Sequence, residues 1–174
     1  MTRYAIGLGS NLGEREELLR AAVADLDDLF DLAGVSGLYE THPIGGPEQE
    51  SYLNAVVIVD TALPAPGVLG ELHRIEGRHG RERHLRWGPR TLDLDIVTSD
   101  GPEIDTPDLV VPHPRASERE FVLRPLCDIW PDALVAGSIT AAKALRGLTP
   151  QGVVLVRASW TASVTPESPS EDAC

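Results

Sequence analysis

The segment RWGPRTLDLDIV places arginines ahead of two aspartates that are separated by one leucine. In a β-strand, alternate side chains point to one face, so Asp93 and Asp95 would share a face with Cα atoms about 6–7 Å apart. Leu92, Leu94 and Ile96 would then face the core. Two carboxylates completed by substrate phosphates are typical of a Mg²⁺ site. The alternative from spacing alone is a solvated strand face that alternates charged and apolar residues.

A cluster of arginines precedes this predicted strand. Arg81, Arg83 and Arg86 lie in a polar loop, residues 80–88, and Arg90 follows it. The guanidinium group matches the geometry of phosphate oxygens, so these residues could bind a polyphosphate. Taken singly, each could instead be a solvated loop residue. The formal net charge of −12 with one basic stretch favours a small anionic ligand over a nucleic acid.

Two further motifs could recognise a ligand. In YLNAV, Tyr52 and Asn54 share one strand face, and an aromatic ring beside an amide suits a flat heterocycle. The same pair could simply be an ordinary strand end. His113 lies between two prolines, which hold it in a rigid, extended backbone. Its alternative interpretation is a histidine of a surface loop.

The segment GLGSNLG, residues 7–13, does not have the glycine spacing of a dinucleotide-binding fingerprint. The chain has a single lysine, Lys143, and no Walker A motif. We therefore expect a tight turn at this segment, and ATP, if bound, is bound without a P-loop. His73 and His79 are six residues apart, which does not form a ligand pair on a helix, so no zinc is expected.

The order of predicted elements indicates how these residues are positioned. Strands are expected over residues 3–8, 35–42, 52–60, 91–97 and 152–157, helices over 14–30, 63–80 and 138–148, and a partly helical segment over 121–134. The core order β-α-β-β-α-β is the split βαβ pattern, which predicts an α+β, ferredoxin-like sandwich: a mainly antiparallel sheet with helices packed on one face. Residues 1–160 would form one domain, and the Pro/Ser-rich residues 161–174 a disordered tail.

The cysteine content and the apolar runs of the sequence indicate the cellular compartment of the protein. Cys127 and Cys174 are too few for a disulfide framework, which fits a reducing compartment. The apolar run at the N-terminus is too short for a signal peptide, and no run approaches the roughly 18 residues of a membrane span. These features predict a soluble, cytoplasmic protein without a membrane partner. We also expect a monomer, and the charge of −12 indicates no nucleic-acid partner.

Taken together, four motifs resemble the 6-hydroxymethyl-7,8-dihydropterin pyrophosphokinase family of folate biosynthesis. They are GLGSNLG, YETHPIGGPEQESYLNAVV, RWGPRTLDLDI and VPHPRASEREFVLRPL, and they occur in the family's order between residues 4 and 135. The resemblance implies a ferredoxin-like enzyme that transfers a diphosphate from ATP to the hydroxymethyl group of the pterin and releases AMP. Its partners would be these two small molecules, and its cofactor Mg²⁺, with two ions expected.

The resemblance also implies roles for individual residues. The two metal ions would be held by Asp93 and Asp95. The pterin would be bound by Thr41, Pro43, Ile44, Tyr52, Asn54 and Phe121, with Tyr52 and Phe121 on the two faces of its ring. ATP would be bound by Glu76, Arg83, Trp87, Arg90, Ile96, His113 and Arg119. The catalytic residues would be Arg81, Arg83, Arg90, Asp93 and Asp95.

Two other classes of function are compatible with parts of the sequence. A non-catalytic ferredoxin-like module could bind a nucleotide or metal for regulation, but it would not need paired aspartates, an arginine loop and a ring-stacking pocket together. An RNA-binding sandwich would need several exposed aromatic residues on its sheet and a basic surface. Aromatic residues make up only 5% of this acidic chain, which disfavours the RNA-binding alternative.

Overall fold

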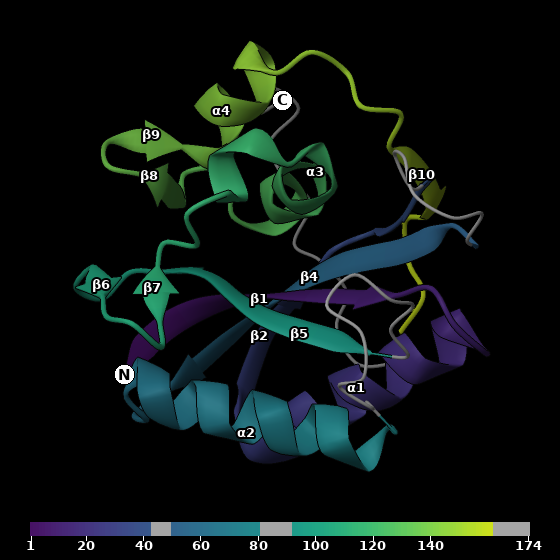
Figure 1. Ribbon diagram of the computed structural model, residues 1–174, viewed down its shortest axis with the longest axis horizontal. Helices are drawn as coiled ribbons and strands as arrows, with labels where there is room; N and C mark the ends of the chain where they lie inside the picture. The colour runs from purple at the N-terminus through teal and green to yellow at the C-terminus, as the bar shows by residue number, and fades with distance from the viewer. Residues whose placement is uncertain (43–49, 81–91, 162–174) are drawn as a thin grey trace.

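The computed structural model describes residues 1–42, 50–80 and 92–161 (Figure 1). The first half contains β1 (Thr2–Ser10), α1 (Arg15–Leu29), β2 (Asp31–Val35), β3 (Leu38–Thr41), β4 (Tyr52–Thr61) and α2 (Ala65–Arg78). The second half contains β5 (Asp93–Ser99), β6 (Ile104–Asp105), β7 (Val110–Val111), a 3-10 turn η1 (Ala116–Glu118), α3 (Glu120–Ile129), β8 (Leu134–Ala136), β9 (Ile139–Thr140), α4 (Ala141–Gly147) and β10 (Val154–Arg157).

Within the described residues, the main sheet has the strand order β10-β3-β4-β1-β5, and β2 also pairs with β4. Every pairing in it is antiparallel, as predicted. The long strands β1 and β4 form its centre and pair from Thr2 opposite Thr61 to Ser10 opposite Leu53. The short strands β6 and β7 form one separate ribbon, and β8 and β9 form another.

Helices cover both faces of the sheet, which corrects the sequence-based expectation of helices on one face. Figure 1 shows α1 and α2 below the sheet and α3 and α4 above it. The first face packs Leu8, Val57 and Leu94 against α1 and α2. The opposite face also carries apolar side chains, including Val56 and Val97, which pack with α3 and α4. Since a sheet with two apolar faces must bury both, α3 is required on the second face.

Local sequence explains most of the element boundaries. In α1 the buried residues Leu19, Ala22, Val23 and Leu26 recur at helical spacing. Helix α2 begins after Pro64, with proline in its first turn, where a missing N–H costs no hydrogen bond. The sequence does not predict strand β2, because three of the five residues in DLAGV (Asp31, Ala33 and Gly34) have low strand propensity. It exists because it pairs with β4.

Candidate functional site

A row of three register partners crosses the sheet on the α3 face. Gly9 of β1 lies opposite Asn54 of β4 on one side and opposite Asp93 of β5 on the other. Residues directly opposite each other share a face, so Asn54 and Asp93 flank a strand position without a side chain. Their Cα atoms are about 10 Å apart, from two strand spacings of about 4.8 Å. The neighbouring row contains Val56, Gly7 and Asp95.

Glycine at position 9 keeps this surface open. A Cβ built there would lie 3.4 Å from Oδ1 of Asn54 and 4.0 Å from the carbonyl oxygen of Leu53. Glycine inside a strand often marks the close approach of a ligand, a signal that the interpretation of GLGSNLG as a tight turn does not use. The structure corrects that expectation: β1 continues to Ser10, and the turn comes later, where Gly13 has a φ of +69°.

Three residues of the predicted pterin pocket meet at one end of this face. Thr41 lies opposite Tyr52 in the β3–β4 pair. The amide Nδ2 of Asn54 donates a hydrogen bond of 3.0 Å to Oγ1 of Thr41. Asn54 is buried, whereas Tyr52 and Thr41 are half-buried. The arrangement places an oriented amide beside an accessible aromatic ring, a combination that can stack and hydrogen-bond a flat heterocycle.

The two aspartates of β5 share a face, as their spacing predicted. Leu94 and Ile96 are 1% and 3% exposed and belong to the core under α1 and α2. Asp93 is half-buried and Asp95 is exposed on the opposite side of the strand. The side chain of Ile96 therefore points away from the aspartates, so any contact of Ile96 with a ligand on their face would involve its backbone.

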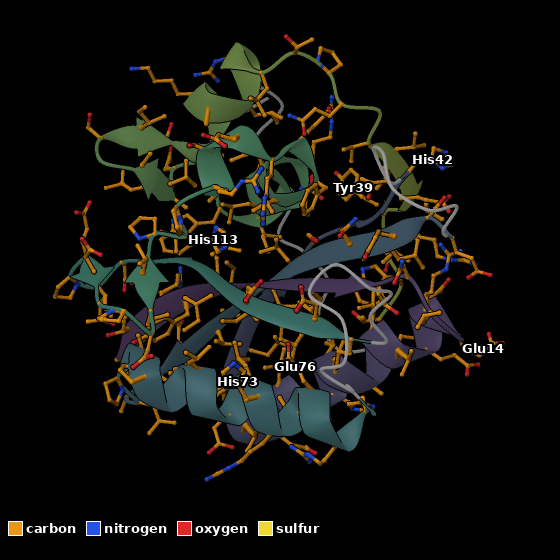
Figure 2. All side chains as sticks on the ribbon, viewed as in Figure 1. Glu14, Tyr39, His42, His73, Glu76 and His113 are labelled. Atoms are coloured by element: carbon orange, nitrogen blue, oxygen red, sulfur yellow. The ribbon has the colours of Figure 1, made fainter. Side chains whose placement is uncertain are left out.

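Glu76 lies behind this strand. Its side chain is 1% exposed, and its Oε1 accepts a hydrogen bond of 2.8 Å from the backbone N–H of Leu94. Figure 2 shows Glu76 on the α2 side of β5 and His113 on the other side. The family resemblance implies an ATP-binding role for Glu76, whereas the structure shows its carboxylate in contact with the strand that carries the aspartates.

His113 approaches β5 from the loop that precedes α3. Its backbone N–H donates to the carbonyl of Val97 at 2.8 Å, which anchors it beside the strand. Its Nδ1 accepts from the backbone N–H of Arg115 at 3.1 Å. Burial lowers the pKa of His113, and this outweighs the opposing effect of the Asp95 charge. The lowered pKa favours the neutral imidazole, and the hydrogen bond accepted by Nδ1 places the proton of that form on Nε2.

Arg119 and Phe121 lie at the start of α3. The guanidinium carbon of Arg119 is 5.7 Å from the centre of the Phe121 ring, within the range of a cation–π contact. Burial lowers the pKa of Arg119, while the charges of Asp95 and Asp93 raise it. The same two carboxylates act on His113. A cation and a neutral imidazole thus lie in the field of the two aspartates.

Six predicted site residues fall outside the described residues: Pro43, Ile44, Arg81, Arg83, Trp87 and Arg90. Within residues 1–42, 50–80 and 92–161, no group of three or more His, Cys, Asp or Glu side chains is arranged to hold a metal ion. The same part of the chain contains no helix that is both long and apolar enough to cross a membrane.

Comparisons with known proteins identify the family of this chain. The family model of 7,8-dihydro-6-hydroxymethylpterin-pyrophosphokinase (HPPK) matches residues 5–131. A 2-amino-4-hydroxy-6-hydroxymethyldihydropteridine pyrophosphokinase of Methylorubrum extorquens is 42% identical over 155 residues, 88% of this chain and 98% of that protein. The Bacillus subtilis protein of the same name is 47% identical over 126 residues, 71% of this chain and 75% of that protein.

Solved structures confirm the predicted fold class. The crystal structure of Plasmodium falciparum HPPK-DHPS A437G with SDX-DHP superposes with a TM-score of 0.65 at 14% identity. The match covers 83% of this chain and 45% of that one, so this chain spans less than half of the Plasmodium protein. That likeness concerns the fold, whereas the sequence matches decide the family. The chain belongs to the 7,8-dihydro-6-hydroxymethylpterin-pyrophosphokinase family.

Proposed function

We propose that this chain transfers a diphosphate from ATP to the hydroxymethyl group of 6-hydroxymethyl-7,8-dihydropterin and releases AMP. The chain is an ATP-dependent pyrophosphokinase of folate biosynthesis, as its family and its relatives at 41–47% identity indicate. The observation that carries the proposal is the row of Asn54, Gly9 and Asp93. This row places the Asn54 amide, which can hydrogen-bond a heterocycle, and the Asp93 carboxylate on either side of Gly9, which has no side chain.

Asp93 and Asp95 suit Mg²⁺, because this hard cation is usually held by one or two carboxylates together with substrate phosphates. Both lie on one face of β5, where Asp93 is half-buried and Asp95 is exposed, and this supports assigning them to one metal site above the sheet. Bound Mg²⁺ would neutralise phosphate charge and orient the transferred group. The proposed number of two ions follows from the resemblance of GPRTLDLDI to the family motif.

For the pterin, we assign ring stacking to Tyr52 and Phe121 and edge recognition to Asn54. The hydrogen bond from Asn54 to Thr41 supports this assignment, because it fixes the amide before the ligand binds. A pre-oriented polar group loses less conformational entropy on binding. Pro43 and Ile44 would complete the pocket, as their places in the THPI segment suggest.

For ATP, we assign phosphate contacts to Arg119 and His113 and to Arg81, Arg83 and Arg90. Burial lowers the pKa of His113, and its Nδ1 accepts a backbone N–H, so its Nε2–H is the group that can donate a hydrogen bond to a phosphate oxygen. The Ile96 backbone and Trp87 would contact the nucleotide, and Glu76 would support the strand beneath it.

The chemistry needs little covalent participation by the protein. The pterin hydroxymethyl oxygen would attack the β-phosphorus in line with the leaving AMP oxygen, so positioning and charge stabilisation dominate. Guanidinium groups would compensate the negative charge that develops on the phosphate oxygens. Arg119 is suited to this role, since it already lies in the field of the two aspartates.

We also propose that residues 1–160 act as one catalytic domain and a monomer in the cytoplasm, on small molecules only. The indole Nε1 of Trp160 donates a hydrogen bond of 2.8 Å to the carbonyl of Ser36, which joins this part of the chain to the sheet. A chain that ends at residue 161 is therefore expected to keep full activity. Cytoplasmic location fits a reaction that consumes ATP.

Phosphorus NMR of one reaction mixture tests the function. ATP, Mg²⁺ and the hydroxymethyl-dihydropterin should give AMP and a pterin diphosphate in equal amounts. ADP with a pterin monophosphate would refute the proposal. A mixture without the pterin controls for hydrolysis of ATP, and a mixture with Asp95→Asn controls for contaminating kinases.

A further inference from the structure

The start of α3 is interlocked with the segment that precedes β10. The backbone N–H of Glu120 donates to Oε1 of Gln151 at 3.0 Å, and Nε2 of Gln151 donates to the carbonyl of Glu118 at 2.9 Å. In return, the backbone N–H of Gln151 donates to the carboxylate of Glu120. Glu120 is only 2% exposed, and it also accepts a hydrogen bond of 2.6 Å from Nε of Arg124.

This interlock replaces an ordinary helix cap. The first N–H groups of a helix lack partners within the helix. Arg119, at the cap position of α3, makes no side-chain hydrogen bond to them. Gln151 satisfies one of these groups from 31 residues downstream. The backbone direction at residues 118–121 is thus set by a segment outside the 5–131 match to the family model.

Glu120 is adjacent in sequence to two residues of the proposed active site, so the interlock can affect both of them. It lies between Arg119 and Phe121, which are assigned above to ATP and to the pterin ring. A change in backbone direction at Glu120 would move both side chains at once. The charge-assisted bonds of its carboxylate, to the N–H of Gln151 and to Arg124, are stronger than neutral ones and suit this holding role.

We propose that Glu120 and Gln151 are positioning residues for the pyrophosphokinase reaction, which fix Arg119 and Phe121 against the sheet. The proposal rests on the proposed function of those two residues. Removal of the Gln151 side chain leaves the exposed Glu118 carbonyl to water but takes the acceptor from the N–H of Glu120, which loosens the start of α3. The bond from the Gln151 backbone N–H to the Glu120 carboxylate remains, so the fold should survive this substitution.

Steady-state kinetics of Gln151→Ala test this inference. The KM for the pterin should rise and kcat should fall, together by about three- to tenfold in kcat/KM, the scale of one or two net hydrogen bonds. Glu120→Gln keeps only one of the two acceptor oxygens and turns an NH2 group toward either Arg124 or the backbone N–H of Gln151, so its kcat/KM should fall between those of wild type and Glu120→Ala. Thr149→Ala changes an exposed residue of the same segment and serves as the matched control.

A double-mutant cycle separates positioning from a general loss of folding. If Gln151 acts through Phe121, the effect of Gln151→Ala on kcat/KM should shrink in the Phe121→Ala background. The inference would be overturned if the effects of Gln151→Ala and Phe121→Ala on kcat/KM were fully additive. Wild-type kinetics of the single variant Gln151→Ala would overturn it as well. Calorimetric titration of the pterin with a non-hydrolysable ATP analogue gives a second readout that does not depend on turnover. Wild-type protein that makes no AMP would instead refute the proposed function.

Discussion

The carboxylate of Glu76 accepts a 2.8 Å hydrogen bond from the backbone N–H of Leu94, the residue between Asp93 and Asp95. Glu76 belongs to α2, under the sheet, whereas the aspartates point to the opposite face. A buried acceptor therefore holds the middle of the strand segment that presents both proposed metal ligands. The position of the aspartates depends on a residue that need not touch the metal.

Glu76→Ala should lower the free energy of unfolding by about 1–3 kcal/mol, because it removes an acceptor from a buried N–H. It should also raise the Mg²⁺ concentration needed for half-maximal activity. Glu76→Gln retains an acceptor oxygen and should show a smaller change in both. Urea unfolding and Mg²⁺ titration of turnover measure these effects. An alanine variant with wild-type behaviour in both would contradict the role.

Asp95→Asn should leave folding intact and reduce turnover at saturating substrates by at least about a hundredfold, since single groups that stabilise developing charge contribute on this scale. Asp93→Asn should behave alike. Asp105→Asn, an exposed residue of β6, is the control and should match wild type. Circular dichroism and kcat at several Mg²⁺ concentrations provide the measurements. Full turnover in either site variant would rule out the aspartate pair as metal ligands.

Gly9→Val should separate activity from stability. The added methyl groups would occupy the open position beside Asn54 and raise the pterin KM by about tenfold or more, the scale of one misplaced methyl in a pocket. Stability should change by less than about 1 kcal/mol, because removing a strand glycine offsets the new contact.

Gly70→Ala is the control for this substitution. Its Cβ would meet no atom within 4 Å on the exposed side of α2, so it should stabilise the helix by up to about 1 kcal/mol without affecting KM. A Gly9→Val enzyme with wild-type pterin KM would show that the ligand does not pass over Gly9.

Burial of Asp128 should make the free energy of unfolding depend on pH. Burial raises the pKa of Asp128 above its ordinary 3.8, although hydrogen bonds from Tyr39 and from the backbone N–H of Gly37 oppose this. Above pH 3.8 the folded state therefore holds this proton more firmly than the unfolded state. Wild type should lose stability relative to Asp128→Asn as the pH rises from about 4 until the folded carboxyl has ionised.

Urea unfolding of the two proteins at several pH values between 4 and 7 measures this difference. Tyr39→Phe removes a hydrogen bond that favours the ionised carboxylate, so in its background the loss relative to Asp128→Asn should be larger. Parallel stability curves of wild type and Asp128→Asn, or a relative gain for wild type with rising pH, would contradict the prediction.

Local patterns in the sequence predicted much of the protein correctly. The alternation around Asp93 and Asp95 predicted their shared face because the side chains of a strand alternate with a period of two. The spacing of Leu19, Ala22 and Leu26 predicted α1, since one face of a helix repeats every three or four residues. Both features depend on neighbours in the chain and can be deduced without knowing what packs on them.

The tertiary structure decided the features that join distant segments. The row of Asn54, Gly9 and Asp93 depends on the register of three strands, and the GLGSNLG segment continues as a strand because β4 and β5 pair with it on both sides. The contact of Glu120 with Gln151 likewise joins segments that no local periodicity relates. Register and helix placement are set by burial and hydrogen bonding summed over the whole fold, so the sequence determined which groups were available, and packing determined which of them meet.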